Sequence, residues 1–149
     1  RRIKDEVPDE DYIVPLGKAA IRREGRDLTI ITFGAMVYTA LEAAKTLEAQ
    51  GVQAEVIDLR SLAPLGKDTI LGSVGHTNRA LLLHEATLTG GIGGELAAII
   101  ADEAFEYLDA PIARVASADT PVPYAPPLET AFLPTVRRVV EGATRLVEY

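Results

Sequence analysis

The 149-residue chain contains no cysteine, no tryptophan and only two histidines. Without cysteine it can form no disulfide scaffold, no thiolate metal centre and no cysteine nucleophile. A catalytic zinc centre usually takes several histidine ligands, and His76 and His84 are too few to supply them. The chain also lacks any run of about 18 apolar residues, so no segment is predicted to span a membrane.

Positive charge is scarce as well, because 15 Lys and Arg face 22 Asp and Glu, for a net charge of −7. Such an acidic chain is poorly suited to bind nucleic acid or an anionic membrane surface, and we expect neither as a partner. The apolar fraction of 48 % and the charged fraction of 25 % are ordinary for globular proteins and argue against a disordered chain. The length predicts one compact domain.

Residues 1–15 differ from the rest, because they are highly charged, contain two prolines and show no apolar periodicity. This composition predicts a linker or extended arm, the plainer alternative being a solvated tail. The chain begins at Arg1 without a signal-peptide pattern. We therefore expect residues 1–15 to be a linker from an upstream domain and residues 16–149 to form the folded domain. The acidic residues of the arm are Asp5, Glu6, Asp9, Glu10 and Asp11.

From residue 16 onward, strand-like and helix-like patterns alternate. Residues 28–33 form an apolar, β-branched run that suits a strand buried on both faces. Residues 95–108 predict an amphipathic helix, with Leu96, Ile100, Ala104 and Tyr107 on its buried face. The alternation predicts an α/β fold of three layers, α/β/α, with a mainly parallel sheet. The expected strands are 18–22, 28–33, 54–59, 80–84 and 112–116; the expected helices are 36–50, 68–74, 95–108 and 136–147, with a proline-rich loop over 119–134.

The turn after the third parallel strand is rich in glycine. Gly90, Gly91, Gly93 and Gly94 precede or open a helix, where backbone N–H groups could cradle an anion. The pattern lacks the third glycine of a dinucleotide-binding motif, since Leu96 stands there, and it has no Walker-type ending. The alternative is a tight strand-to-helix turn in which two backbone segments approach closely.

Charged residues stand beside this turn and after two further strands. His84, next to Glu85, could act as a general acid or base, or it could be a hydrogen-bonded packing residue. Asp58 and Arg60 could bind a substrate or simply hold the strand-to-loop geometry. Leu88 replaces the second histidine of a metalloprotease motif.

The remaining candidates are weaker. Ser73 lacks the glycine that a nucleophile elbow requires at residue 71. The segment that begins with Asp119 and Pro121 contains a PxxP pattern, which suggests either a polyproline ligand or an ordered loop at an interface. Composition and spacing alone therefore predict an acidic α/β domain with no autonomous active site.

Several of these stretches, taken in order, resemble the C-terminal domain of the transketolase-like family. The most similar members are the β-subunits of thiamine-diphosphate-dependent 2-oxo acid dehydrogenases, the decarboxylating components of the pyruvate and branched-chain complexes. The resemblance runs from about Tyr12 to the end and implies a five-stranded mixed sheet, with residues 18–22 as the antiparallel strand. The matching stretches are 56–64, 84–86, 90–95, 108–111, 119–124 and 133–134.

The resemblance also implies where the chemistry lies. Thiamine diphosphate and Mg would be bound outside this chain, between domains absent from it, since no Gly-Asp-Gly diphosphate motif occurs. We therefore expect no catalytic, cofactor-binding or metal-binding residue here and no activity from the isolated chain. The complete enzyme would be cytoplasmic in a bacterium and would oxidatively decarboxylate pyruvate or a branched-chain 2-oxo acid, with acyl transfer to lipoyl groups.

The implied role of the domain is assembly and docking. It would join an α-subunit and a second β-subunit in an α2β2 tetramer and bind the peripheral subunit-binding domain of the acyltransferase core. That partner is basic, so the acidic charge would assist the encounter, and the Tyr149 carboxylate, if native, would contribute. Two alternatives stay open: a stand-alone module that binds an anionic effector, and the same domain from another transketolase-type enzyme such as deoxyxylulose-phosphate synthase.

Overall fold

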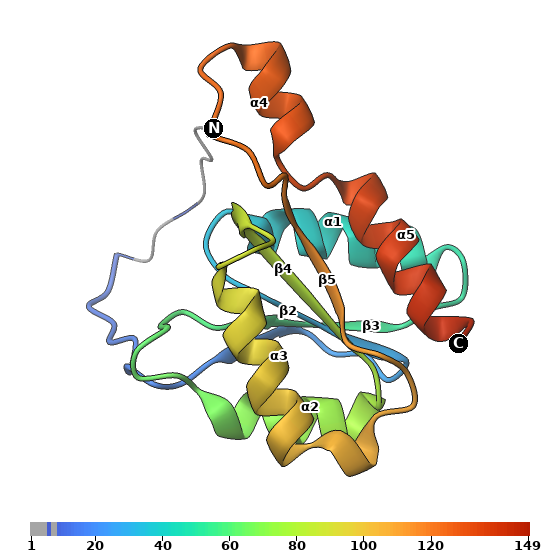
Figure 1. The fold of residues 1–149 in the computed structure, drawn as a ribbon. Coiled ribbons are helices and arrows are strands. Elements are labelled where there is room, and N and C mark those ends of the chain that lie inside the picture. The colour runs from blue at the N-terminus through green and yellow to red at the C-terminus, as the bar shows by residue number, and fades with distance from the viewer. Residues whose placement is uncertain (1–5, 7–8) are drawn as a thin grey trace.

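The computed structural model describes residue 6 and residues 9–149. A five-stranded sheet in the order β1-β3-β2-β4-β5 forms its centre (Figure 1). Strand β1 pairs antiparallel with β3, and the other neighbouring pairs are parallel, as expected. The strands are β1 (Ala20–Arg23), β2 (Leu28–Thr32), β3 (Ala54–Asp58), β4 (Ala80–Thr87) and β5 (Ala113–Ser117).

Helices cover both faces of this sheet, which confirms the predicted three layers. Helices α1 (Met36–Glu48) and α5 (Val136–Val147) pack on one face, and α2 (Lys67–Thr77) and α3 (Ile92–Glu103) pack on the other. A short 3₁₀ turn, Phe105–Tyr107, follows α3. Helix α4 (Pro126–Phe132) projects beyond the end of the sheet at which the parallel strands finish (Figure 1).

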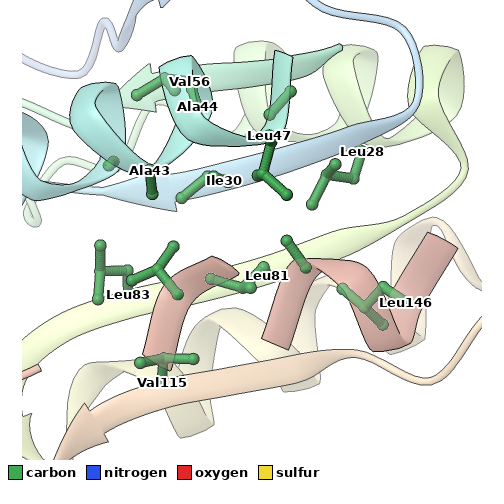
Figure 2. Packing of buried hydrophobic residues seen from close by; sticks show 14 of the residues in the cluster. Leu28, Ile30, Ala43, Ala44, Leu47, Val56, Leu81, Leu83, Val115 and Leu146 are labelled. Carbon is green, nitrogen blue, oxygen red and sulfur yellow. The ribbon is translucent and has the colours of Figure 1, made fainter. Parts of the chain in front are cut away.

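Strand β2 shows why the sheet is central, because all five of its residues are buried. Its side chains alternate, so Leu28 and Ile30 join the cluster beneath α1 and α5, while Ile31 joins the cluster beneath α2 and α3. Leu47 of α1 inserts beside Leu28 and Ile30 (Figure 2). Burying each such side chain contributes about 1.5–3 kcal/mol, so these two clusters hold the layers together.

A polar cluster is buried beneath α2. The hydroxyl groups of Thr29 and Ser73 lie 2.6 Å apart, and those of Thr29 and Thr77 are also separated by 2.6 Å. Ser73 also donates a hydrogen bond to the buried carboxylate of Glu55. Ser73 therefore anchors α2 to β2 and β3 from inside the protein.

Two predicted helices have different limits in the structure. The helix expected over 95–108 begins earlier, at Ile92, and ends at Glu103, where Ala104 leaves helical geometry with φ −138°. Tyr107 is consequently 46 % exposed, so its predicted burial was wrong. Helix α2 continues past Gly75 and ends before Asn78, which adopts a left-handed conformation with φ 59°.

The proline-rich segment contains a helix that the sequence did not reveal. Helix α4 lies inside the loop expected over 119–134, and Pro126 occupies its first position, where a missing N–H costs nothing. Strand β4 likewise runs three residues past its expected end at His84, through an irregularity in its pairing with β5. None of the described helices is long and apolar enough to cross a membrane.

Candidate functional site

The loops that were singled out lie at the carboxyl edge of the sheet. The connection from β2 leads through α1 to β3, whereas that from β4 leads through α3 to β5 on the other side. Ligands of parallel sheets usually bind where neighbouring connections diverge in this way. The turn between β4 and α3 is therefore the first place to look for a site.

His84 is packed against the first turn of α3. Its side chain is buried, and Nδ1 lies 3.2 Å from the carbonyl oxygen of Ala86. A Cβ atom on Gly91 would lie 2.6 Å from His84 Cε1, and one on Gly93 would lie 2.3 Å from Nε2. Both distances are too short for any side chain, so the imidazole ring accounts for Gly93, while at Gly91 the backbone oxygen of Thr87, 2.4 Å from the same Cβ position, excludes a side chain as well.

The protonation of His84 follows from the same contacts. Burial lowers its pKa, the hydrogen bond to Ala86 opposes this shift, and the positive charge of Arg114 reinforces it. Because a carbonyl oxygen only accepts, Nδ1 carries the proton of the neutral ring. Nε2 is buried and has no hydrogen-bond partner among the described residues. The ring is closed to any substrate, which favours the packing role over a general acid or base.

The carboxylate of Asp119 is bonded to Thr89, directly before the glycine-rich turn. Its carboxylate accepts hydrogen bonds from the backbone N–H of Thr89 at 2.9 Å and from the Thr89 hydroxyl at 2.7 Å. The backbone bond is the largest cause of a lowered Asp119 pKa, with the hydroxyl and, more weakly, Leu88 and Arg114 adding to it. The turn thus already holds a carboxylate from its own chain, which argues against a phosphate cradle.

The other glycines and charges of this turn are less constrained. Gly90 has a positive φ of 74°, and a Cβ on Gly94 would meet nothing closer than Arg114 Nη1 at 3.8 Å. Arg114 itself donates a hydrogen bond of 3.3 Å to the Leu88 carbonyl oxygen. Glu85 is exposed and makes no ion pair with any described residue.

Asp58 and Arg60 form a turn rather than a side-chain ion pair. Asp58 Oδ1 accepts a 3.1 Å hydrogen bond from the backbone N–H of Arg60. Arg60 has a positive φ of 58°, which is uncommon for a non-glycine residue. Pro121 lies elsewhere on the edge, exposed on the segment that follows Asp119. The carboxyl edge therefore brings together His84, the glycines and Asp119.

A groove lies at the opposite, amino edge of the sheet, beside the C-terminal residue. Its volume is about 410 Å³, and Tyr149 and Phe105 are 77 % and 73 % exposed there. Asp109 is part of the lining, and Glu106 is exposed next to Phe105. The other lining residues are Ala101, Leu108, Ala110, Pro111 and Ile112.

Comparison with known proteins decides the family. The family described as "Transketolase, C-terminal domain" matches residues 17–139. The chain belongs to the transketolase C-terminal domain family. A split-gene transketolase, solved as an inactive β4 tetramer, superimposes with a TM-score of 0.81 at 30 % identity, over 97 % of this chain and 46 % of that one.

Full-length relatives of this transketolase C-terminal domain come from several enzymes of Bacillus subtilis (strain 168). The β-subunit of acetoin:2,6-dichlorophenolindophenol oxidoreductase is 46 % identical over 97 % of this chain and 42 % of its own length. The β-subunit of the pyruvate dehydrogenase E1 component is 46 % identical, and that of 2-oxoisovalerate dehydrogenase is 45 % identical, each over 100 % of this chain and 46 % of its own length. The chain thus spans under half the length of these relatives.

The sequence could not reveal the partners that complete the transketolase C-terminal domain's turn. Thr89 and Arg114 had no motif to mark them, because Asp119 meets Thr89 across 30 residues of sequence. Glu55 also passed unnoticed, since only the fold places it beside Ser73. Among the described residues, no group of three or more His, Cys, Asp or Glu side chains could hold a metal ion.

Proposed function

We propose that this chain is the C-terminal assembly and docking domain of the β-subunit of a 2-oxo acid dehydrogenase. The observation that carries the proposal is the near-equal similarity to β-subunits named for acetoin, pyruvate and 2-oxoisovalerate, at 46 %, 46 % and 45 % identity. A segment that selected the substrate would be expected to favour one of the three. A segment with a task shared by all three enzymes, such as joining subunits, would not be expected to resemble one of them more than the others.

The proposal leaves the chemistry to other parts of the enzyme. Thiamine diphosphate and its Mg would be bound outside residues 16–149, because the residues present do not fit them. The glycine-rich turn is filled by His84 and Asp119, and the described residues offer no cluster of metal ligands. In this proposal the arm over 1–15 connects to an upstream domain, and the complete enzyme is an α2β2 tetramer of the bacterial cytoplasm.

A domain exchange tests the assembly role. Residues 16–149 would replace the matching segment in the pyruvate dehydrogenase and 2-oxoisovalerate dehydrogenase β-subunits of B. subtilis, each co-expressed with its own α-subunit. We expect both chimeras to assemble and to keep the substrate preference of the host. A chimera that changed its preferred 2-oxo acid, or that folded yet failed to bind its α-subunit, would contradict the proposal.

The docking surface in this proposal is the groove beside Tyr149. Its lining includes Phe105, Tyr149 and Asp109, and Glu106 is exposed next to Phe105 in the sequence. Asp109 also forms a 3.9 Å ion pair with Arg79. An apolar groove with an acidic rim suits a small basic partner such as the peripheral subunit-binding domain, because opposite charges accelerate the encounter. The Tyr149 carboxylate would add to this rim if Tyr149 is the native end.

Calorimetric titration with a peripheral subunit-binding domain tests this surface. Glu106→Lys/Asp109→Lys should weaken binding by about tenfold or more and reduce its dependence on salt. The control Glu42→Lys/Glu129→Lys makes the same change in net charge at exposed positions away from the groove. Equal weakening by both pairs would refute the assignment of the groove.

A further inference from the structure

His84 is a buried titratable residue that the proposed function does not use. It is 1 % exposed, and its Nε2 atom is buried without a hydrogen-bond partner among the described residues. Protonation would add an N–H at Nε2 and give the ring a full positive charge. Neither the new donor nor the charge would meet an acceptor there, and burying such a group unpaired is costly. The position therefore accommodates the neutral imidazole and disfavours the imidazolium.

The groups that pack around the ring also oppose a positive charge. Gly91 and Gly93, whose Cβ positions would touch the imidazole, belong to the N-terminal end of α3, which is the positive end of the helix dipole. Burial lowers the pKa of His84 most, the carbonyl oxygen of Ala86 raises it, and the charge of Arg114 lowers it. Arg114 lies on β5, on the same face of the sheet as the ring. Strand β2, the other neighbour of β4, contributes no charged residue.

The carboxylates near the ring in the sequence and the fold do not act as its counter-ion. Glu85 follows His84 on β4, so its side chain belongs to the opposite face of the sheet, where it is exposed. Glu95 in the first turn of α3 is exposed as well, and Asp119 is bonded to Thr89. Among the described residues, no carboxylate forms an ion pair with His84. An imidazolium at this position would therefore be without a compensating negative charge.

The backbone next to the ring is weakly fixed. The pairing of β4 with β5 is irregular between His84 and Thr87, and residues 88–90, which follow, are exposed. Helix α3 begins at Ile92, and its N-cap residue, Gly91, supplies no side-chain hydrogen bond to the first turn. Segments of this kind open at a lower free energy than buried strands such as β2. Residues 90–96, which contain the glycines and the first turn of α3, are called the switch segment below.

We propose that His84 is a pH-sensitive switch whose protonation releases the switch segment while the sheet stays folded. The neutral ring packs against Gly91 and Gly93 and so holds the start of α3 against β4. When the segment opens, water reaches the ring, and the open form binds a proton more readily than the closed form. Since the pKa of His84 is lowered in the closed form, that form is most stable above about pH 6.5. It is progressively weakened as the pH falls from there to the folded-state pKa.

The hydrogen bonds between Asp119 and Thr89 keep the opening local. They attach the residue directly before the turn to the end of β5, and the backbone bond is the largest cause of the lowered Asp119 pKa. The Asp119 carboxylate therefore stays charged above the usual aspartate pKa of about 3.9. Between the titration of His84 and that of Asp119, the turn is held at Thr89 and released at the ring. The switch thus acts at a higher pH than the loss of this second attachment.

Hydrogen exchange measured by mass spectrometry tests the switch in the 149-residue chain, from about pH 8 down to about pH 4.5. After correction for the intrinsic exchange rate at each pH, protection of the switch segment should fall by up to about tenfold per pH unit below about pH 6.5. The fall should level off at the folded-state pKa of His84, which the NMR signal of its Cε1 proton gives independently. Protection of the switch segment should not respond to about 1 M urea, whereas protection of the buried strand β2 should decrease.

Two histidine variants separate the imidazole from other effects of acid. His84→Asn keeps a donor for the Ala86 carbonyl oxygen but takes up no proton, so protection of its switch segment should be the same at about pH 8 and about pH 5. The control His76→Gln removes the other histidine, which is exposed on α2, and should keep the pH dependence of the parent chain. It also leaves His84 as the source of the one histidine NMR signal.

Four results would overturn the proposal. They are protection of the switch segment that does not change with pH in the parent chain, a pH dependence that persists in His84→Asn, a levelling pH that differs from the pKa measured by NMR, and a urea response equal to that of β2. The last result would mean that the whole domain unfolds. If His84→Asn does not fold, the levelling pH and the urea response of the parent chain decide the question.

Discussion

Replacing Gly93 by alanine tests whether the imidazole of His84 is what demands glycine in the turn. The new Cβ would lie 2.3 Å from His84 Nε2 and 2.7 Å from Cδ2, far inside ordinary contact distance. The ring is buried and bonded to Ala86, so it has little room to move. Overpacking of this kind costs up to about 3 kcal/mol, while alanine gains about 1 kcal/mol over glycine inside a helix. We expect Gly93→Ala to lower the free energy of unfolding by about 2 kcal/mol.

A double-mutant cycle with His84→Ala isolates the cause. Without the ring the clash disappears, and Gly93→Ala should then stabilise the protein by up to about 1 kcal/mol, giving a coupling of about 3 kcal/mol. Gly94→Ala is the matched control, because its Cβ would meet nothing closer than 3.8 Å. Urea unfolding followed by circular dichroism suits a chain without tryptophan. If Gly93→Ala had the same effect with and without His84, the ring would not be the reason for the glycine.

Three further changes test other parts of the structure. The pKa of Asp119 is lowered in the folded state, so its carboxylate stabilises the fold above the unfolded-state pKa of about 3.9, and this stabilisation is lost as the pH falls through the folded-state pKa. Asp119→Asn should remove this acid-side contribution to the pH dependence of Tm. An unchanged pH profile of Tm would show that the hydrogen bonds to Thr89 contribute nothing. Ser73→Ala leaves the buried Glu55 carboxylate without its hydroxyl donor and should cost about 1–3 kcal/mol in urea unfolding, and a loss below 0.5 kcal/mol would mean that water replaces the hydroxyl. Leu47→Ala, in the cluster beneath α1, should cost about 2–5 kcal/mol, and a smaller loss would show that the core closes over the gap.

The three layers could be predicted because the periodicity of apolar residues and the glycines that end helices are signals from residues close together in the sequence. Residues 28–33 and 54–59 predicted β2 and β3 to within one residue, and the helix expected over 36–50 is α1 extended by two residues. Gly51 indeed adopts a positive φ of 85° directly after that helix region. Such signals come from residues that are neighbours in the chain, so they can be recognised without knowing the fold.

The errors arose where a distant contact decided the local structure. Helix α3 starts at Ile92, and Gly93 in its first turn leaves room for the His84 ring. The low helix propensity of glycine alone argues against a helix start there. Residues 119–134 looked like a loop because of their prolines, yet Pro126 is compatible with the first position of α4. Tyr107 matched the helical period but lies beyond the point where α3 ends. In each case tertiary geometry overrode a correct local rule.

The glycine-rich turn shows how a ligand-binding pattern can serve packing. Its glycines make room for a neutral imidazole on one side, and its free N–H at Thr89 is taken by Asp119 on the other. An incoming anion at Thr89 would have to displace this carboxylate, whose pKa is lowered mainly by the hydrogen bond from the Thr89 backbone N–H. Contacts within the chain therefore occupy this part of the edge at which parallel α/β sheets usually bind their ligands. In the proposed function, the surface left for a protein partner is the amino-edge groove beside Tyr149, whose lining includes Phe105.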